Sequence, residues 1–567
     1  MGKNFKAWPK HWPKTMDYPE LPVYEFLDQT AARVPNRVGI IFGGMELTYQ
    51  ELKDLSDRFA SALLDMGVQK GDRVAINLIN CPQFAIAYYA ILRIGGVFTP
   101  LSPMLSPPEA KHQLSDSGAK ILISLDLIYP GIHSVIPETP VEKVITTSIA
   151  DCYNALIQPL KPLGKIDVPD TIDMVPLLAK YEPYTGKVDI DVKKDLAHIA
   201  YTGGTTGLSK GVMLTHYNVF TNCLQFGGWP DGTHVEYKDG KLTTVFPAEA
   251  DPESRISFQD KETALVVVPW FHAMGTVGYL NMQISGGTTM VVFPRFEAQE
   301  YIDGIAKYNV TILGGAPQLF IPLINLPDFD EYDLTSVKYA ASGAAPLPGV
   351  VMDKLLDAFS GTVVEAYGLT ECTMGATSNP PRRENMRLGS VGLPVFDTDV
   401  QIVDLASGEV MPAEEEGEIC IKGPQVMQGY WNRPDATADV LKDGWLRTGD
   451  IGRMDEDGFV FITDRLKDMI IYKGYNVYPR ELEEVIFTHP AVEQCAVIGK
   501  PDETVGESPI AFVKLVQGAS VEAAELMEFT NPKVAAYKKV REIIFVDEIP
   551  VSGAGKVLKR ELRKQFE

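Results

Sequence analysis

Residues 196–212 read LAHIAYTGGTTGLSKGV. An apolar run, Leu196 to Ala200, leads into a loop with four glycines, three threonines, one serine and Lys210. Open backbone N–H groups, hydroxyls and an ammonium suit a phosphate chain, although a flexible surface turn is the alternative. Open α/β proteins place ligand loops at such strand ends. Neither the Walker A register nor Gly-x-Gly-x-x-Gly occurs, which disfavours a P-loop kinase or an NAD enzyme.

The sequence on both sides of this loop alternates between strand-like and helix-like segments. Val38–Ile41 and Val74–Leu78 predict strands, and between them leucines and a phenylalanine recur at helical spacing after a capping box of Thr48 and Glu51. The same alternation continues at 264–268, 310–313, 350–359 and 363–366. The fold class is therefore α/β, with parallel sheets covered on both faces.

The pattern changes twice towards the C-terminus. After about residue 390 strands and turns alternate, and after Asp464 one amphipathic helix, Pro479 to Phe487, stands among several strands. We expect a large domain at 1–464, with a β-rich subdomain at about 390–464, and a small mobile α+β domain at 465–567. Residues 225–262 are polar and predict a surface insertion.

Composition excludes several classes of function. The 567 residues are 45% hydrophobic and 22% charged, as in ordinary globular proteins, and the net charge of -23 makes nucleic acid a poor partner. The six cysteines are widely spaced, so their spacing indicates no metal pair and no redox dithiol, and such cysteine usage fits a cytoplasmic location. The uncharged stretch 263–294 is interrupted by Pro269 and by Gly286-Gly287, so we predict no transmembrane segment. The N-terminal MGKNFKAWPKHWPK predicts either weak peripheral membrane contact or packing on the domain.

The loop YTGGTTGLSKGV resembles the phosphate loop of the adenylate-forming superfamily, which includes acyl-CoA synthetases, luciferases and adenylation domains. Further motifs follow in that family's order as far as Lys556, and the resemblance therefore covers most of the chain. It implies that ATP phosphates are bound by Thr202, Gly203, Gly204, Thr205, Thr206, Gly207 and Lys210.

The remaining nucleotide contacts are implied by three further motifs. Ala366–Glu371, AYGLTE, resembles the segment in which the Tyr packs on adenine, the Thr contacts the α-phosphate and the Glu holds Mg²⁺. Asp450 matches the carboxylate that accepts the ribose hydroxyls, and Arg465 the arginine that reaches the same sugar. The implied nucleotide-binding residues are Ser342, Gly343, Ala344, Ala345, Glu365, Ala366, Tyr367, Gly368, Asp450 and Arg465, with Thr370 and Glu371 catalytic.

The C-terminal motifs imply a moving domain. Lys467 matches the hinge residue, Gly474 the glycine beside the pantetheine arm of coenzyme A, and Lys556 the catalytic lysine that bridges carboxylate and α-phosphate. Some relatives carry a second lysine where this chain has Ile471; either Lys473 substitutes for it or no lysine is required there.

The acid end of the site is implied by Pro269–Gly275, PWFHAMG, which resembles the segment beside the acyl pocket. His272 is either a catalytic residue at the substrate carboxylate or a core histidine.

These features together predict an ATP-dependent acyl-CoA synthetase that activates a fatty or other apolar carboxylic acid to acyl-AMP and then forms acyl-CoA. The alternatives are an adenylation enzyme that loads a carrier protein and a silent nucleotide-binding regulator. A homodimer is a further expectation. The length and branching of the acid are left open, as is the role of 225–262.

Overall fold

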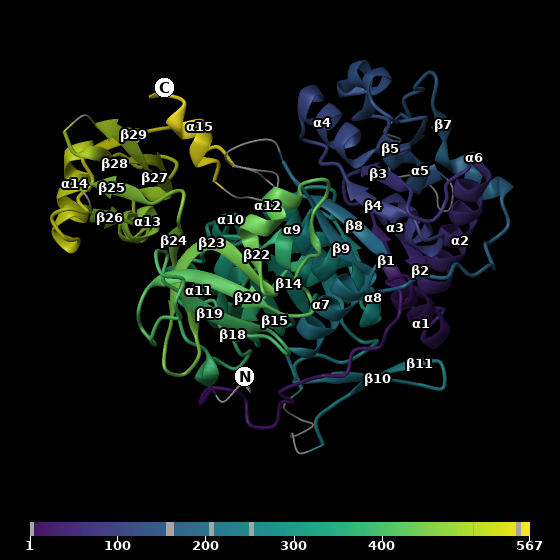
Figure 1. Cartoon of the computed structure of the whole chain (residues 1–567), viewed down its shortest axis with the longest axis horizontal. Helices are drawn as coiled ribbons and strands as arrows, with labels where there is room; N and C mark the ends of the chain where they lie inside the picture. Colours follow the sequence, from purple (N-terminus) through teal and green to yellow (C-terminus); the bar gives the residue numbers. More distant parts are fainter. Residues whose placement is uncertain are drawn as a thin grey trace.

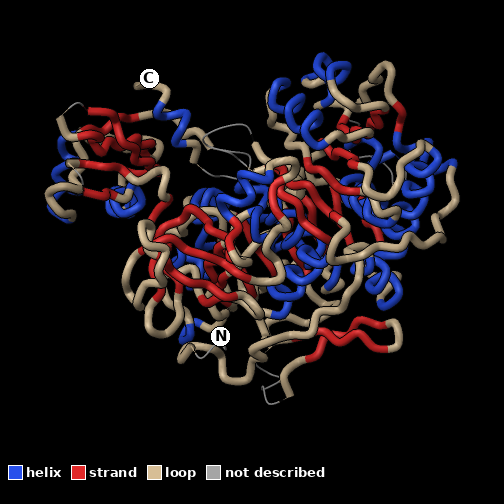
Figure 2. The backbone as a smooth tube through the Cα atoms, in the orientation of Figure 1, coloured by secondary structure: helices blue, strands red, loops and turns tan. Residues whose placement is uncertain are grey.

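The computed structural model describes residues 5–154, 164–202, 209–248, 255–473, 475–502, 504–551 and 557–566. Figures 1 and 2 show a large mixed body and, to its left, a small unit that carries the C-terminus. The predicted fold class is confirmed, since sheets of mainly parallel strands alternate with helices in the large body.

The first large sheet has the strand order β18-β17-β16-β15-β14-β12-β13-β1-β2. Pairing is parallel from β16 to β1 and antiparallel at both edges. Its strands are β1 (Val38–Phe42), β2 (Met45–Thr48), β12 (Thr263–Val266), β13 (Thr289–Val292), β14 (Ile312–Gly315), β15 (Tyr339–Ser342), β16 (Thr362–Tyr367), β17 (Thr377–Ser378) and β18 (Leu393–Pro394). The carboxyl ends of β14, β15 and β16 therefore meet at one edge, where open sheets bind ligands.

The second large sheet has the order β21-β9-β8-β4-β3-β5-β6-β7. It is parallel from β8 to β7, and β9 and β21 add antiparallel strands beyond β8. Its strands are β3 (Arg73–Asn77), β4 (Val97–Pro100), β5 (Ile121–Leu125), β6 (Lys143–Thr147), β7 (Ile172–Asp173), β8 (Leu196–Tyr201), β9 (Gly211–Thr215) and β21 (Gly429–Tyr430). The glycine-rich loop runs from β8 to β9.

Helices cover and join the two sheets. The predicted capping box is confirmed in α2, where the Thr48 hydroxyl accepts the Glu51 N–H and the Glu51 side chain accepts the Thr48 N–H. Helix α3 is buried along its whole length. The helices of the large body are α1 (Glu25–Arg33), α2 (Tyr49–Asp65), α3 (Pro82–Arg93), α4 (Pro107–Ser117), α5 (Ile149–Asn154), α6 (Met174–Lys180), α7 (His216–Gly228), the π-helix η4 (Met274–Asn281), α8 (Met282–Ser285), α9 (Ala298–Tyr308), α10 (Pro317–Ile324), α11 (Gly349–Ala358) and α12 (Pro434–Val440).

Two smaller sheets follow. The first has β20 (Gly417–Lys422) between β19 (Asp399–Val403) and β23 (Trp445–Met454), with β22 (Leu441–Lys442) and β24 (Val460–Arg465) both on β23. The second belongs to the small unit, which contains β25 (Ile470–Tyr472), β26 (Tyr475–Val477), α13 (Pro479–Phe487), β27 (Val492–Asp502), β28 (Gly506–Leu515), α14 (Ala523–Thr530), β29 (Glu542–Phe545) and α15 (Lys559–Arg563). Its apolar clusters consist of residues from 470 onwards. The domain boundary at 464/465 stays a prediction.

The segment 225–262 needs a correction. It was predicted as a surface insertion, but its first residues complete α7, and Gln225 and Trp229 are fully buried. Among the described residues of this segment, the hairpin β10 (His234–Lys238) and β11 (Lys241–Val245) matches the polar exterior that the composition indicated. Polar composition misled the prediction because Gln225 bonds inside the core, donating to the Phe396 carbonyl at 2.6 Å.

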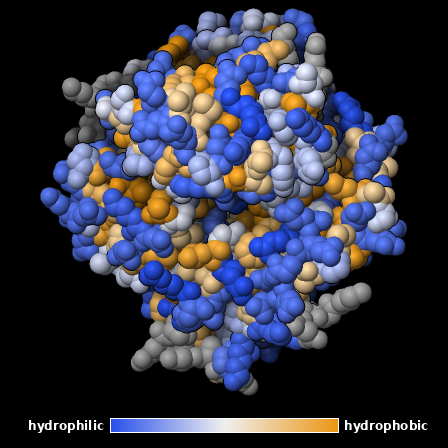
Figure 3. All heavy atoms as spheres, turned by 90° about the vertical axis from the view of Figure 1, so that its left-hand side faces the viewer, coloured by the Kyte–Doolittle hydropathy of each residue, from blue (hydrophilic) through white to orange (hydrophobic). Residues whose placement is uncertain are grey.

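The N-terminal aromatic residues pack on the domain. The Trp8 ring lies 5.6 Å from Trp229 and the Trp12 ring 4.8 Å from it, in edge-on contacts that also involve Phe396. These contacts favour the packing interpretation of the N-terminal stretch. Within the described residues, none of the helices is both long enough and apolar enough to cross a membrane. The face that carries the small unit is mainly hydrophilic, with scattered apolar side chains (Figure 3).

Candidate active site

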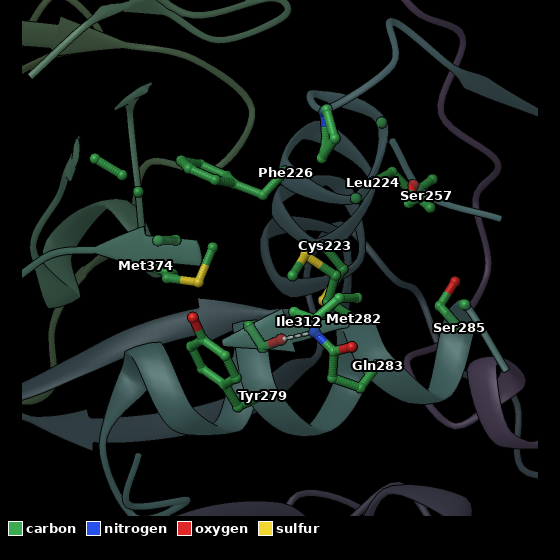
Figure 4. Close-up of a pocket in the computed structure, with 18 of the residues that line it drawn as sticks. Cys223, Leu224, Phe226, Ser257, Tyr279, Met282, Gln283, Ser285, Ile312 and Met374 are labelled. Atoms are coloured by element: carbon green, nitrogen blue, oxygen red, sulfur yellow. Dashed lines mark hydrogen bonds between the residues drawn. The ribbon is translucent and has the colours of Figure 1, made fainter. Parts of the chain in front are cut away.

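A cavity of about 270 Å³ runs from the starts of β14 and β15 to the carboxyl ends of β15 and β16, between α7 on one side and η4 with α8 on the other. Its lining joins Gly343, Ala344 and the run Ala366–Thr370 to side chains of both helices. Two of the predicted nucleotide motifs and the predicted acyl segment therefore border one continuous space. Figure 4 shows that space between the two helical walls, with Met374 at one end and Ser285 at the other.

The Ser342–Ala345 segment forms the wall after β15. Ala344 has φ of 67°, in the left-handed region that a residue with a side chain rarely adopts. The Ser342 hydroxyl is buried and has no hydrogen-bond partner among the described residues. Behind it, Glu365 accepts the Leu347 N–H at 3.0 Å, and burial raises the pKa of that carboxyl. Small side chains and a strained turn leave room for a flat ligand against this backbone.

Tyr367, Asp450 and Arg465 come together from three separate motifs. The Tyr367 hydroxyl donates to the Asp450 carboxylate at 2.6 Å, and the Arg465 Nε lies 3.2 Å from its other oxygen. Asp450 is only 5% exposed, so its charge needs both partners. Burial, followed by the Asp450 charge, raises the pKa of Tyr367 well above 10, and the phenol therefore remains a donor. The proposed adenine, ribose and hinge motifs thus share one hydrogen-bonded group.

Glu371 has a neighbour that the sequence interpretation missed. The Tyr430 hydroxyl donates to the Glu371 carboxylate at 2.7 Å, and the Lys210 ammonium lies 4.4 Å from the Tyr430 ring centre. β21 carries Tyr430 and pairs with β9, the strand that follows the glycine-rich loop. In the sequence, Gly429-Tyr430 alone does not indicate a functional residue. The pairing of β21 with β9 brings Tyr430 to the site.

The phosphate loop is described only at its ends. Thr202 donates its N–H to the Lys210 carbonyl at 3.0 Å, which closes the base of the loop. Gly203, Gly204, Thr205, Thr206 and Gly207 lie outside the described residues, as do Gly474 and Lys556. Their predicted roles remain predictions.

The donor set at Glu371 fits the predicted Mg²⁺. Thr370, Glu371 and Cys372 form a short 3₁₀ turn, and no described Lys or Arg nitrogen lies within 4.0 Å of the Glu371 carboxylate. Hard carboxylate oxygen suits Mg²⁺, which takes the rest of its ligands from phosphate and water. The described residues contain no cluster of three or more His, Cys, Asp or Glu side chains that would hold a metal alone.

His272 stands at the junction of the nucleotide and acyl ends. It follows β12 and accepts the Met274 N–H on Nδ1 at 3.4 Å, while lining the cavity. The next turn is a π-helix, whose wider backbone is typical of functional sites. Its second residue is Gly275, and a side chain does not fit there because a Cβ would lie 1.9 Å from the Pro269 carbonyl oxygen. Buried Trp270 supports this turn through its indole N–H, which donates to the Tyr279 carbonyl at 3.1 Å.

The channel beyond His272 is apolar in its middle. Leu224 and Phe226 project from α7, and Tyr279 and Met282 face them from η4 and α8 (Figure 4). Glycines keep this space open, since a Cβ on Gly375 would lie 2.3 Å from the Phe226 ring. The channel therefore suits the hydrocarbon part of an acid.

The segment after β24 links the two units. Asp464, near the end of β24, accepts the Arg480 N–H at 2.9 Å at the start of α13, and within the small unit Lys559 pairs with Glu483 at 2.8 Å. Lys467 lies on the exposed turn that follows Arg465. Ile471 is 49% exposed, and Lys473 occupies the turn between β25 and β26 with φ of 50°. The role of Lys473 in place of the second lysine stays a prediction.

Comparison with known proteins agrees with this architecture. Residues 27–431 match the family model of the AMP-binding enzyme, and residues 481–556 match the AMP-binding enzyme C-terminal domain. The chain therefore belongs to the AMP-binding enzyme family, which confirms the predicted adenylate-forming membership.

The similar curated proteins lie in the predicted acyl-CoA synthetase branch. A long-chain-fatty-acid–CoA ligase of Bacillus subtilis (strain 168) is 36% identical over 98% of this chain and 97% of its own length. A feruloyl-CoA synthase of an Amycolatopsis species is 34% identical over 94% and 96%. Among solved structures, ATP-bound MatB from Rhodopseudomonas palustris has a TM-score of 0.81 at 27% identity, covering 96% of this chain and 99% of that one.

Proposed function

We propose that this protein is an ATP-dependent acyl-CoA synthetase that joins a carboxylic acid with a long apolar body to coenzyme A. The observation that carries the proposal is the single cavity whose lining includes both the Ala366–Thr370 motif and the apolar faces of α7 and α8. A nucleotide at one end and an acid in the channel would bring α-phosphate and carboxylate together beside His272 and Thr370. The fatty-acid and feruloyl relatives favour an acid of this kind.

The first step forms an acyl-adenylate. A carboxylate oxygen attacks the α-phosphorus of ATP, the bond to the β-phosphate bridge breaks, and pyrophosphate leaves. Thr370 contacts the α-phosphate, and the Lys556 ammonium stabilises the negative charge on the reacting groups. Tyr367 and Ser342–Ala345 hold the adenine, and Asp450 and Arg465 the ribose. Bound Mg²⁺ at Glu371 would neutralise phosphate charge.

The second step transfers the acyl group. The thiol sulfur of coenzyme A attacks the acyl carbon, the bond to the AMP oxygen breaks, and the thiol proton goes to solvent. A thiol with a pKa near 8.5 needs an activated acyl group more than a strong base. Rotation of the small unit about Lys467 would exchange Lys556 for the Gly474 loop between the steps.

The test is pyrophosphate release from MgATP over a panel of short, branched, aromatic and long-chain acids, with and without coenzyme A. The proposal expects AMP and one preferred acyl-CoA, identified by mass. AMP and pyrophosphate without thioester would transfer the assignment to a carrier-loading adenylation enzyme. Absence of turnover with every acid would favour the silent regulator. The cytoplasmic location, homodimer and peripheral membrane contact stay predictions.

A further inference from the structure

The far end of the acyl channel differs in chemistry from its apolar middle. There α8 ends against the segment 255–262, with the Asp260 N–H donating to the Gly286 carbonyl at 2.8 Å. Ser257 and Ser285 lie at this end, opposite Met374 (Figure 4). The polar residues in the lining of the whole cavity include Thr233, His234, Thr244, Gln259, Gln283 and Ser285. A terminal methyl group would gain little from such a wall.

Two acidic side chains near this end are paired with cations. Glu262 lines the cavity, but Lys338 lies 3.1 Å from its carboxylate and the Phe258 N–H donates to it at 2.9 Å. Asp260 pairs with Arg33 at 2.9 Å. These two pairs leave little net charge, whereas buried Asp231 has no Lys or Arg nitrogen within 4.0 Å among the described residues and accepts hydrogen bonds from the Ile256 N–H and from the N–H and hydroxyl of Ser257.

Arg255 also lines the cavity, two residues before Ser257. Its positive charge is not paired with a carboxylate of the described residues. Among the described residues, no carboxylate oxygen lies within 4.0 Å of its guanidinium. An arginine side chain cannot lose its proton under ordinary conditions, so the cavity wall keeps a positive charge here.

Two aromatic rings position this guanidinium. Its central carbon lies 4.1 Å from the Phe246 ring centre and 5.8 Å from that of Phe258. Contact with a ring occupies the flat face of the group and leaves its N–H edges available. Those edges match the two oxygens of a carboxylate, which arginine binds through paired hydrogen bonds.

We propose that the acid accepted by this channel carries a second carboxylate at its far end, held by Arg255, and is therefore an α,ω-dicarboxylate with an apolar middle. This inference rests on the acyl-CoA synthetase function proposed above. From Met274 to Ser285 the helical wall is up to about 17 Å long at about 1.5 Å per residue. With C–C bonds of about 1.5 Å in a zigzag, an extended acid of roughly a dozen carbons fits that length.

The test compares three acids of equal chain length: dodecanedioate, its monomethyl ester and dodecanoate. The measured quantity is kcat/KM for acyl-CoA formation with MgATP and coenzyme A. The wild-type protein should prefer the diacid over both others by about 10- to 100-fold, the range of a hydrogen bond between charged groups. Equal or better use of dodecanoate would overturn the dicarboxylate assignment while leaving the synthetase function intact. Failure of all acids in the wider panel would instead remove the proposed function.

Variants distinguish a role of Arg255 in recognising the second carboxylate from a role in folding. Arg255→Met should abolish the diacid preference and leave dodecanoate turnover within about twofold, whereas Arg255→Lys should retain part of the preference. Lys261→Met is the matched control, because Lys261 is exposed and carries the same charge near Phe258 without lining the cavity. An equal loss on both acids in Arg255→Met, or the same selective loss in Lys261→Met, would contradict the role of Arg255.

Discussion

The Tyr430 hydroxyl donates a hydrogen bond of 2.7 Å to the carboxylate of Glu371, the residue proposed to hold Mg²⁺. The bond links β21 to the motif after β16, and the Lys210 ammonium over the Tyr430 ring extends it to the phosphate loop. Tyr430 therefore positions two groups that the proposed mechanism directs at ATP phosphates.

Tyr430→Phe should slow adenylate formation about tenfold, since it removes one hydrogen bond to a charged group but keeps the ring below Lys210. The loss should shrink as Mg²⁺ is raised, because metal binding would orient Glu371 in place of the hydroxyl. Pyrophosphate release measured over a Mg²⁺ titration tests this. A defect that does not change with Mg²⁺ would contradict the positioning role.

Lys556→Ala should lower adenylate formation by at least about 100-fold, the effect of removing a positioned charge at a transition state. Thioester formation from supplied acyl-AMP should be largely spared, because that step does not use the lysine in the proposed mechanism. Rapid-mix assays of the two half-reactions separate these outcomes. Equal losses in both steps would contradict the proposal that Lys556 acts in adenylate formation and not in thioester formation.

Gly314→Ala should reduce the use of long acids. A Cβ at Gly314 would lie 1.2 Å from the Tyr279 hydroxyl oxygen, so the tyrosine that lines the channel must move. Such overpacking costs about 1–3 kcal/mol of stability. We expect a lower melting temperature and a KM that rises more for dodecanoate than for a short acid. Gly349→Ala is the control, since a Cβ there meets nothing within 4 Å.

Two buried histidines predict loss of stability in acid. Burial lowers the pKa of His198 to about 3 and that of His216 to about 4, against 6.5 for an exposed histidine. Above pH 6.5 both are neutral in the folded and unfolded states. As pH falls below 6.5 the unfolded chain binds their protons first, and each therefore costs about 2 kcal/mol by pH 5.

His216→Asn tests that assignment. His216 accepts the Val23 N–H on Nδ1 at 3.2 Å, and an asparagine oxygen can take over this bond. The fall in melting temperature from pH 7 to pH 5 should be smaller in the variant, although its stability at pH 7 is slightly lower. An unchanged fall would show that His216 does not titrate on unfolding.

Several parts of the structure were predictable because local chemistry decides them. Thr48 and Glu51 mark the start of α2, and Pro479 to Phe487 matches α13 residue for residue. Strand limits were less certain, as β14 begins at Ile312 rather than Val310. Neighbouring strands determine that limit, and the apolar sequence around it does not.

The site was predictable where a motif is contiguous and was missed where tertiary pairing creates it. Tyr367 and Asp450 belong to recognisable motifs, and a hydrogen bond joins them in the structure. Tyr430 reaches Glu371 only through the pairing of β21 with β9, and Arg255 reaches the channel from a segment whose polar composition indicated solvent. The π-helix at Met274–Asn281 likewise depends on packing around Gly275.

The central claim is that the acid is activated by forming a bond to the α-phosphate, and an oxygen-transfer measurement tests it most directly. The preferred acid is labelled with ¹⁸O in its carboxylate and turned over with MgATP and coenzyme A, and the products are analysed by mass. The account predicts one ¹⁸O atom in AMP for each acyl-CoA formed, and unlabelled pyrophosphate. Label in inorganic phosphate, or AMP without label, would contradict it.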